Sequence, residues 1–277
     1  KAPQCRLMSR VIHFVQNLSL DITAGAVVMS FFVAHLLGVA LTVSMVIGLA
    51  IAIWLIYTLD HLKDAVHSQL PVLNPRHAFH RKYIKELIIG VLVAFGLGLW
   101  NLFRLPQRTI LFGSVLVILV ALYFAYLHFS KHSLRKEYLA ALIYTAGVSL
   151  APLSLAEQVN RHEMLVILQI FLLALVNLMV IPLYEFSLDL SDGQFSIVTQ
   201  RGKRAVRQSA IVLLVLVLLM AFWMMASWPA IFYEELVLLA MALVLVILLA
   251  FQRLFGRYQL YRVLADGIFF LPLILWL

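Results

Sequence analysis

The sequence predicts an all-α protein that crosses a membrane several times. Hydrophobic residues make up 64% of the 277 residues, whereas charged residues make up only 12%. A soluble domain is closer to half apolar and a quarter charged, so this chain has too little charge to cover a surface exposed to water. The mean hydropathy of +1.01 leads to the same conclusion. An ordinary water-soluble enzyme is therefore excluded, and a lipid bilayer is expected to surround most of the chain.

Nine stretches of the chain are apolar enough to form transmembrane helices, each of which needs about 20 mostly apolar residues. Gly38 and the Trp228-Pro229 pair lie between stretches, where chain-breaking residues are expected. Because the stretches leave no room for a soluble domain, we predict one transmembrane domain over residues 1–277, a helical bundle of nine spans. The predicted spans are residues 22–38, 41–60, 84–103, 109–129, 138–156, 164–186, 208–227, 232–251 and 261–277.

The segment before the first span gives two further expectations. Cys5 is the only cysteine, which excludes an internal disulfide framework and a multi-cysteine metal site. Residues 1–20 are polar and mixed, so we expect no cleavable signal peptide.

The basic residues predict the orientation of the chain. All of the 21 Lys and Arg residues except Arg104, Arg108 and Arg161 lie before the first span or around the loops that follow the even-numbered spans. Short cytoplasmic loops collect Lys and Arg, so the amino terminus is predicted to be cytoplasmic and the carboxyl terminus outside. We expect an integral location such as the bacterial inner membrane. Contact with anionic lipid accounts for the net charge of +8, and no nucleic-acid partner is expected.

Acidic residues gather at the predicted cytoplasmic ends of the second and sixth spans. Asp60 and Asp64 are four residues apart, as are Glu185 and Asp189, and Asp192 follows three residues later. In a helix, each set projects its carboxylates from one face. Acids are costly inside a membrane, and Mg²⁺ prefers a few carboxylates together with water and phosphate oxygens. The two clusters predict a site for one or two Mg²⁺ ions; the alternative is that they are solvated helix ends paired with nearby basic side chains.

Basic residues follow both acidic clusters. Arg76 lies in the loop after the first cluster, and Arg201 and Lys203 lie in the loop after the second. Cationic side chains beside metal-held phosphates neutralise the charge that develops on a departing diphosphate. The positive-inside pattern requires the same residue types, so a purely topological role is the alternative.

The span count, the orientation and the placement of the acids resemble the UbiA superfamily of intramembrane prenyltransferases. That family has nine helices and two aspartate-rich motifs, after the second and sixth helices, facing the cytoplasm. Its first motif reads N-D-x-x-D-x-x-x-D; Asp60 and Asp64 match the later aspartates, whereas Ile56 and Tyr57 stand where Asn and Asp belong. The resemblance covers nearly the whole chain, and the chain resembles a divergent member whose first motif is incomplete.

The second family motif resembles D-x-x-x-D followed by Gly and a basic stretch. Glu185 and Asp189 fit it, with Asp192 close by and residues 199–203, Thr-Gln-Arg-Gly-Lys, downstream. Arg76 is similar to the family's arginine after the first motif. Lys131, at the predicted cytoplasmic end of the fourth span, resembles a family basic residue that can meet diphosphate.

The resemblance implies a Mg²⁺-dependent transferase that moves a prenyl group from a prenyl diphosphate to a lipophilic acceptor, such as an aromatic ring. Metal and basic residues would stabilise the departing diphosphate and leave an allylic carbocation in an apolar cavity. The implied catalytic and metal-binding residues are Asp60, Asp64, Glu185 and Asp189, with Asp192 as a further metal ligand. The implied diphosphate-binding residues are Arg76, Lys131, Arg201 and Lys203.

Three polar residues inside the spans are candidates for the cavity wall, namely Tyr57, Tyr144 and Asn177. Tyrosines of membrane proteins also serve as interfacial or packing residues, and an asparagine can form a hydrogen bond between helices. Asp266 lies early in the last span beside Arg262, where a charge pair is expected.

Other function classes remain open at this point. Six histidines lie near the predicted cytoplasmic side, and membrane di-iron oxidases bind iron through histidine boxes. Here no adjacent His-His pair exists, and the spacing from His61 to His67 does not fit such a box. A transporter is another alternative, although no repeated pair of interrupted helices supports it. A non-catalytic, lipid-binding descendant of the prenyltransferase fold is the last alternative.

Overall fold

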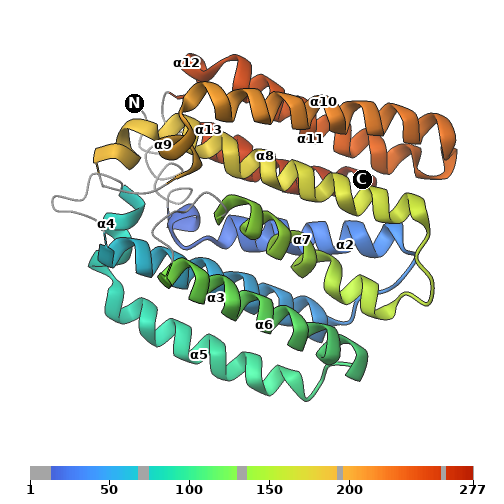
Figure 1. The fold of residues 1–277 in the computed structure, drawn as a ribbon. Coiled ribbons are helices and arrows are strands. Elements are labelled where there is room, and N and C mark those ends of the chain that lie inside the picture. The colour runs from blue at the N-terminus through green and yellow to red at the C-terminus, as the bar shows by residue number, and fades with distance from the viewer. Residues whose placement is uncertain (1–13, 68–74, 130–135, 192–195, 257–259, 277) are drawn as a thin grey trace, which may run out of the picture.

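The protein is built from helices that pack side by side (Figure 1). The computed structural model describes residues 14–67, 75–129, 136–191, 196–256 and 260–276. Every regular element within these ranges is helical. The elements are α2 (Leu20–Leu36), α3 (Val43–His67), α4 (Pro75–Lys82), α5 (Ile84–Leu102), α6 (Gln107–Phe129), α7 (Lys136–Leu155), α8 (Arg161–Ser191), α9 (Ile197–Arg201), α10 (Lys203–Ser227), the 3-10 helix η1 (Pro229–Ile231), α11 (Phe232–Ala250), α12 (Gln252–Phe255), α13 (Leu260–Gly267) and the 3-10 helix η3 (Ile268–Trp276).

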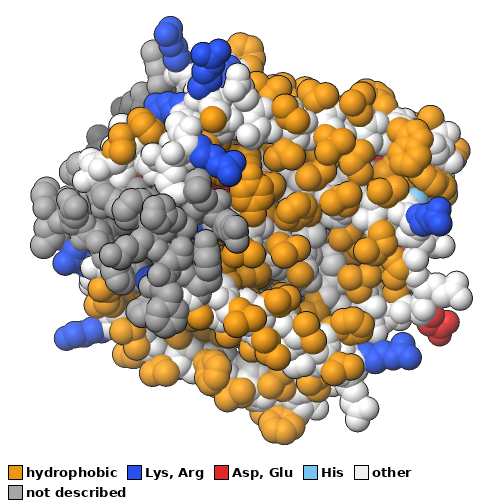
Figure 2. All heavy atoms as spheres, viewed as in Figure 1, with side chains coloured by type: hydrophobic (Ala, Val, Ile, Leu, Met, Phe, Trp, Pro, Cys, Tyr) orange, Lys and Arg blue, Asp and Glu red, His pale blue; other side chains and the backbone are white. Residues whose placement is uncertain are grey.

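Seven helices in the described part of the chain are long and apolar enough to cross a membrane. These helices are α3, α5, α6, α7, α8, α10 and α11 with the preceding η1. On the face that Figure 2 shows, apolar side chains cover the middle of the bundle, and Lys and Arg side chains lie toward its ends. The described residues therefore confirm an all-α architecture with several helices that could cross a membrane. Each of these seven helices overlaps one predicted span.

The first and last predicted spans have other forms. The first corresponds to α2, an apolar helix of 17 residues. The last consists of the short helix α13 followed by η3, which contains Pro272. Proline has no N–H for an α-helical hydrogen bond, and the tighter 3-10 form is common in short pieces near helix ends.

Two turns coincide with the predicted chain-breaking residues. Gly38 follows α2 with φ of 65°, a left-handed conformation that glycine adopts without a steric cost. Pro229 begins η1 between α10 and α11, where its fixed φ suits the first helical turn. Both turns lie between apolar helices, as the sequence predicts.

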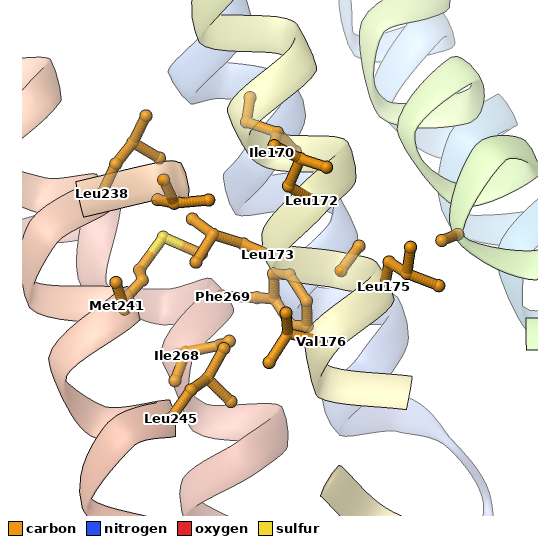
Figure 3. Close-up of a cluster of buried hydrophobic side chains, with 14 of the residues drawn as sticks. Ile170, Leu172, Leu173, Leu175, Val176, Leu238, Met241, Leu245, Ile268 and Phe269 are labelled. Carbon is orange, nitrogen blue, oxygen red and sulfur yellow. The ribbon is translucent and has the colours of Figure 1, made fainter. Parts of the chain in front are cut away.

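Helix α8 forms the centre of the core. Its main neighbours are α7, α10 and α11. Leu173 and Val176 of α8 lie in a cluster with Met241 of α11 and Phe269 of η3 (Figure 3). A helix that is apolar on all sides belongs in the interior of a bundle. By contrast, most side chains of α5 and α6 are exposed on the outside, where lipid is expected.

Candidate functional site

Both predicted acidic clusters contribute to the lining of one cavity of about 260 Å³. The lining includes Ser196, which precedes α9, and α9 and α4 lie at the same end of the bundle (Figure 1). Helices α3, α7, α8 and α13 supply most of its wall. The predicted site residues that line it are Tyr57, Asp60, Tyr144, Asn177, Glu185 and Asp189. Residues far apart in the chain are therefore brought to one place.

Helical periodicity explains which side chains reach the cavity. On α8, the lining positions recur mostly every three or four residues from Ala174 to Asp189. On α3, they recur in the same way from Ile53 to Asp60. Residues with this spacing share one face of a helix. Glu185 and Asp189 accordingly line the same cavity, as their spacing predicts.

The carboxylates of α3 and α8 lie at one end of the cavity, and the lining farther along these two helices is mainly apolar, with Tyr57 and Asn177 as polar exceptions. On α8, the lining changes from Ala174 and Leu178 to Glu185 and Asp189 as the helix approaches its end. On α3, the lining changes from Ile53 to Asp60 in the same direction. The cavity therefore suits a ligand with a charged head and an apolar body.

Glu185 is held by two donors from α13. The Arg262 Nε atom donates to Glu185 Oε1 over 2.7 Å, and the Tyr261 hydroxyl donates to the same oxygen over 2.8 Å. All three side chains are buried. The ring of Tyr261 stacks on that of Tyr184, with centroids 4.4 Å apart and an interplanar angle of 5°. Charge-assisted hydrogen bonds are short and strong, so this cluster joins the end of α8 to α13.

Two acids link the beginning of α7 to its neighbours. Asp60 of α3 forms an ion pair with Lys136, whose Nζ atom lies 3.3 Å from Asp60 Oδ2. Glu137 Oε1 accepts a hydrogen bond from the backbone N–H of Ile197 over 2.7 Å. That N–H belongs to the first turn of α9, where the helix leaves donors unsatisfied. Lys136 and Glu137 therefore fix three elements around the mouth of the cavity.

Carboxylates outnumber cationic side chains around the cavity. Five acids line it, whereas Lys136 and Arg262 are the Lys and Arg residues among the described lining. The lining acids are Asp60, Glu137, Glu185, Asp189 and Asp266. An excess of negative charge in a low-dielectric site favours the binding of a cation.

The donor chemistry of the cavity fits magnesium, a hard cation that binds carboxylate oxygens and keeps several waters. Among the described residues, no three His, Cys, Asp or Glu side chains lie close enough together to form a metal site by themselves. A magnesium ion would therefore complete its coordination with water or with ligand oxygens. Two predicted ligands, the side chain of Asp64 and the whole of Asp192, lie outside the described residues.

The wall contains buried polar atoms that have no hydrogen-bond partner within the described chain. Two of them belong to neutral side chains, the hydroxyl oxygen of Tyr144 and Oδ1 of Asn177. Buried polar groups are nearly always hydrogen-bonded, so each such atom calls for an explanation. Since both residues line the cavity, a polar atom of a ligand would satisfy them.

Arg201 and Lys203, which the structure describes, are not among the residues that line the cavity. Arg201 and Lys203 are exposed, and Lys203 Nζ lies 4.5 Å from the ring centroid of Phe186. Arg76 belongs to α4, but its side chain is outside the described part of the structure, as is the whole of Lys131.

The structure adds site residues that sequence reasoning did not select. Lys136, Glu137 and Tyr261 are not among the predicted residues. Arg262 interacts electrostatically with Asp266, as the sequence predicts, and in addition binds Glu185 on another helix. The position of these residues in or beside predicted spans could have indicated them from the sequence. Ionisable residues at such positions are rare and are usually functional or paired.

No protein-family model, curated protein or solved structure matches the chain. Function is therefore inferred from the residues of the cavity itself.

Proposed function

We propose that the protein is a UbiA-like intramembrane prenyltransferase, which moves a prenyl group from a prenyl diphosphate to a lipophilic acceptor and depends on Mg²⁺. The observation that supports this proposal most strongly is the convergence of both acidic clusters on one cavity, whose lining along α3 and α8 becomes mainly apolar away from the acids. A prenyl diphosphate has the same division, with an anionic head and a hydrocarbon chain. An aromatic ring is a suitable acceptor, because it is apolar and supplies electrons.

The proposal includes nine membrane passes and a cytoplasmic cavity mouth. Helix α2 and the α13–η3 segment would add two passes to the seven long helices. The basic residues support this orientation, since all of the 21 Lys and Arg residues except Arg104, Arg108 and Arg161 lie in segments that the sequence predicts to face the cytoplasm. We place the protein in a membrane such as the bacterial inner membrane, with its amino terminus cytoplasmic and its carboxyl terminus outside.

The excess of acids explains why a metal cofactor is part of the proposal. A diphosphate alone would be repelled by five carboxylates facing two cationic side chains, so it needs accompanying cations. One or two magnesium ions would be held by acids from the set Asp60, Asp64, Glu185 and Asp189, with Asp192 as a further ligand. Water and diphosphate oxygens would supply the other ligands, because no three of the described acids lie close enough together to hold an ion by themselves. When bound, the metal supplies positive charge that stabilises the leaving diphosphate.

The chain's own residues would position both substrates. Arg76, Lys131, Arg201 and Lys203 are assigned to the diphosphate, whose oxygen keeps the electron pair when the bond to the allylic carbon breaks. The apolar walls exclude water from the resulting carbocation. The Tyr144 hydroxyl and Asn177 Oδ1 would orient a polar group of the acceptor, with Tyr57 beside them. The acceptor then forms a bond to the cation and releases a proton.

A second candidate is a non-catalytic lipid-binding protein with the same fold. Two observations favour it: Ile56 and Tyr57 line the cavity where the family carries oxygen ligands, and Glu185 Oε1 already accepts two hydrogen bonds. Such a protein would bind a prenyl diphosphate without turning it over.

A thermal-shift screen of the purified protein tests both candidates. Prenyl diphosphates of several lengths are added with and without Mg²⁺, and the unfolding temperature is expected to rise only when both are present. Asp60→Asn and Asp189→Asn should abolish turnover while the protein remains folded in detergent. Binding without turnover in the wild type would favour the non-catalytic candidate, and the absence of any Mg²⁺-dependent binding would contradict the proposal.

A further inference from the structure

A second cavity lies between α6 and α7, directly beside the charged one. Its volume is about 270 Å³, and it shares two lining residues, Tyr123 and Ile143, with the first cavity. These two side chains are buried, with 6% and 8% of their surface exposed. They form a shared wall where the two spaces adjoin, and a ligand that occupied both spaces would pass between these two side chains.

The described residues that line this groove are all apolar or aromatic. They recur with helical spacing on both sides, so one face of α6 meets one face of α7. Besides the two shared residues, the lining consists of Leu116, Leu119, Leu122, Leu139, Leu142 and Ala146. A groove of this composition offers no partner for a charge and suits a hydrocarbon chain.

The outer edge of the groove is open. Leu119, Leu122 and Leu142 are 46%, 60% and 51% exposed, in contrast to the buried residues of the shared wall. Since α6 and α7 are both long and apolar enough to span a membrane, we expect this edge to face lipid. A chain from the bilayer could therefore lie in the groove without separating the two helices.

We propose that the groove between α6 and α7 holds the hydrocarbon chain of the prenyl diphosphate, while the diphosphate lies at the charged end of the first cavity. This inference rests on the proposed function and adds the path of the chain. Leu139 follows Glu137 by two residues, so the groove begins close to the charged end. From Tyr123 to Leu116 it continues over seven residues, roughly 10 Å along the helix at 1.5 Å per residue.

The arrangement gives the two substrates separate places. With the prenyl chain in the groove, the part of the first cavity around Tyr144 and Asn177 remains available for the acceptor. The allylic carbon would then lie near the shared wall, where the two spaces meet.

The test is the preference of the protein for long over short prenyl diphosphates. In detergent with Mg²⁺, binding of farnesyl and dimethylallyl diphosphate is measured for the wild type, for Ala146→Phe, which fills the groove, and for Ala121→Phe. Ala121 is an exposed alanine of α6 that lines neither cavity, so it is a matched control. Detergent dissolves each ligand equally in all three samples. A difference in affinity between the variants therefore reports whether the prenyl chain binds in the groove.

Ala146→Phe is expected to weaken farnesyl diphosphate binding about tenfold and dimethylallyl diphosphate binding less than about twofold, since overpacking excludes the longer chain. Ala121→Phe should behave as the wild type. If Ala146→Phe weakened the binding of both ligands equally, or of neither, the claim that the groove holds the hydrocarbon chain would be overturned. The proposed function would not be affected by that result. If the wild type binds neither ligand, the proposed function itself fails.

If Ala146→Phe does not fold, a labelling experiment on the wild type determines where the prenyl chain lies. Farnesyl diphosphate with a photoreactive group at the end of its chain is expected to label α6 and α7. Labelling of α3 and α8 instead would place the chain in the depth of the first cavity and overturn the inference. Labelling spread over the lipid-facing helices, α5 included, would show that bulk lipid occupies the groove.

Discussion

Two buried acids of this protein, Glu185 and Glu235, have opposite surroundings. Glu185 lies beside the cavity and binds the cationic side chain of Arg262. Glu235 is fully buried and accepts a hydrogen bond from the neutral amide of Gln169, over 2.9 Å. That amide nitrogen also lies 3.0 Å from the sulfur of Met224, so the second cluster joins α8, α10 and α11.

The difference distinguishes an acid of the candidate site from an acid in a packing contact between helices. A carboxylate that is buried with neutral partners is very costly, so we expect Glu235 to carry a proton and to act as a hydrogen-bonding group between helices. Glu185 has a permanently charged partner and borders an open space. Burial of an acid therefore does not by itself indicate a site; a counter-charge together with a cavity does.

The largest expected effect on stability comes from Glu185→Gln. The substitution leaves the buried Arg262 without its carboxylate, and losing one member of a buried pair costs about 3 kcal/mol or more. Unfolding of the purified protein in mixed detergents measures this loss. Adding Arg262→Gln to the first substitution should recover part of the stability. A loss below about 1 kcal/mol would show that the ion pair does not hold α13 on α8.

Tyr261→Phe tests the second donor of the same cluster. The phenylalanine keeps the stacking on Tyr184 but removes the hydroxyl that donates to Glu185, so a loss of about 1 kcal/mol is expected. The same unfolding assay applies. Tyr233→Phe, on an exposed tyrosine of α11, serves as the control and should leave stability unchanged. Equal behaviour of the two variants would contradict the assigned hydrogen bond.

Glu235→Gln should have the smallest effect. A glutamine keeps an acceptor oxygen for Gln169, so the free energy of unfolding should change by about 0.6 kcal/mol or less. Gln169→Leu should lower the free energy of unfolding more, because it removes the donor and leaves the buried oxygen of Glu235 without a hydrogen bond. If Glu235→Gln destabilised the protein as strongly as Glu185→Gln, Glu235 would be charged, and the comparison between the two acids would fail.

The sequence predicts the parts of the site that follow from local spacing. The interval of four residues places Glu185 and Asp189 on one face of α8, and the alternation of membrane passes brings Asp60 to the same end of the bundle. The bond from Arg262 to Glu185 spans 77 positions, so no local pattern contains it. The 3-10 form of the last apolar segment depends on its packing in the same way.

The most direct test of the central claim is a calorimetric titration of farnesyl diphosphate with Mg²⁺ into the wild type, Asp189→Asn and Glu235→Gln. The cavity is proposed to bind the metal and the diphosphate through acids such as Asp189, whereas Glu235 belongs to the packed core. Asp189→Asn is therefore expected to weaken binding at least about tenfold, and Glu235→Gln to change it less than about twofold. Equal affinity of Asp189→Asn and the wild type would contradict the claim that this cavity is the binding site.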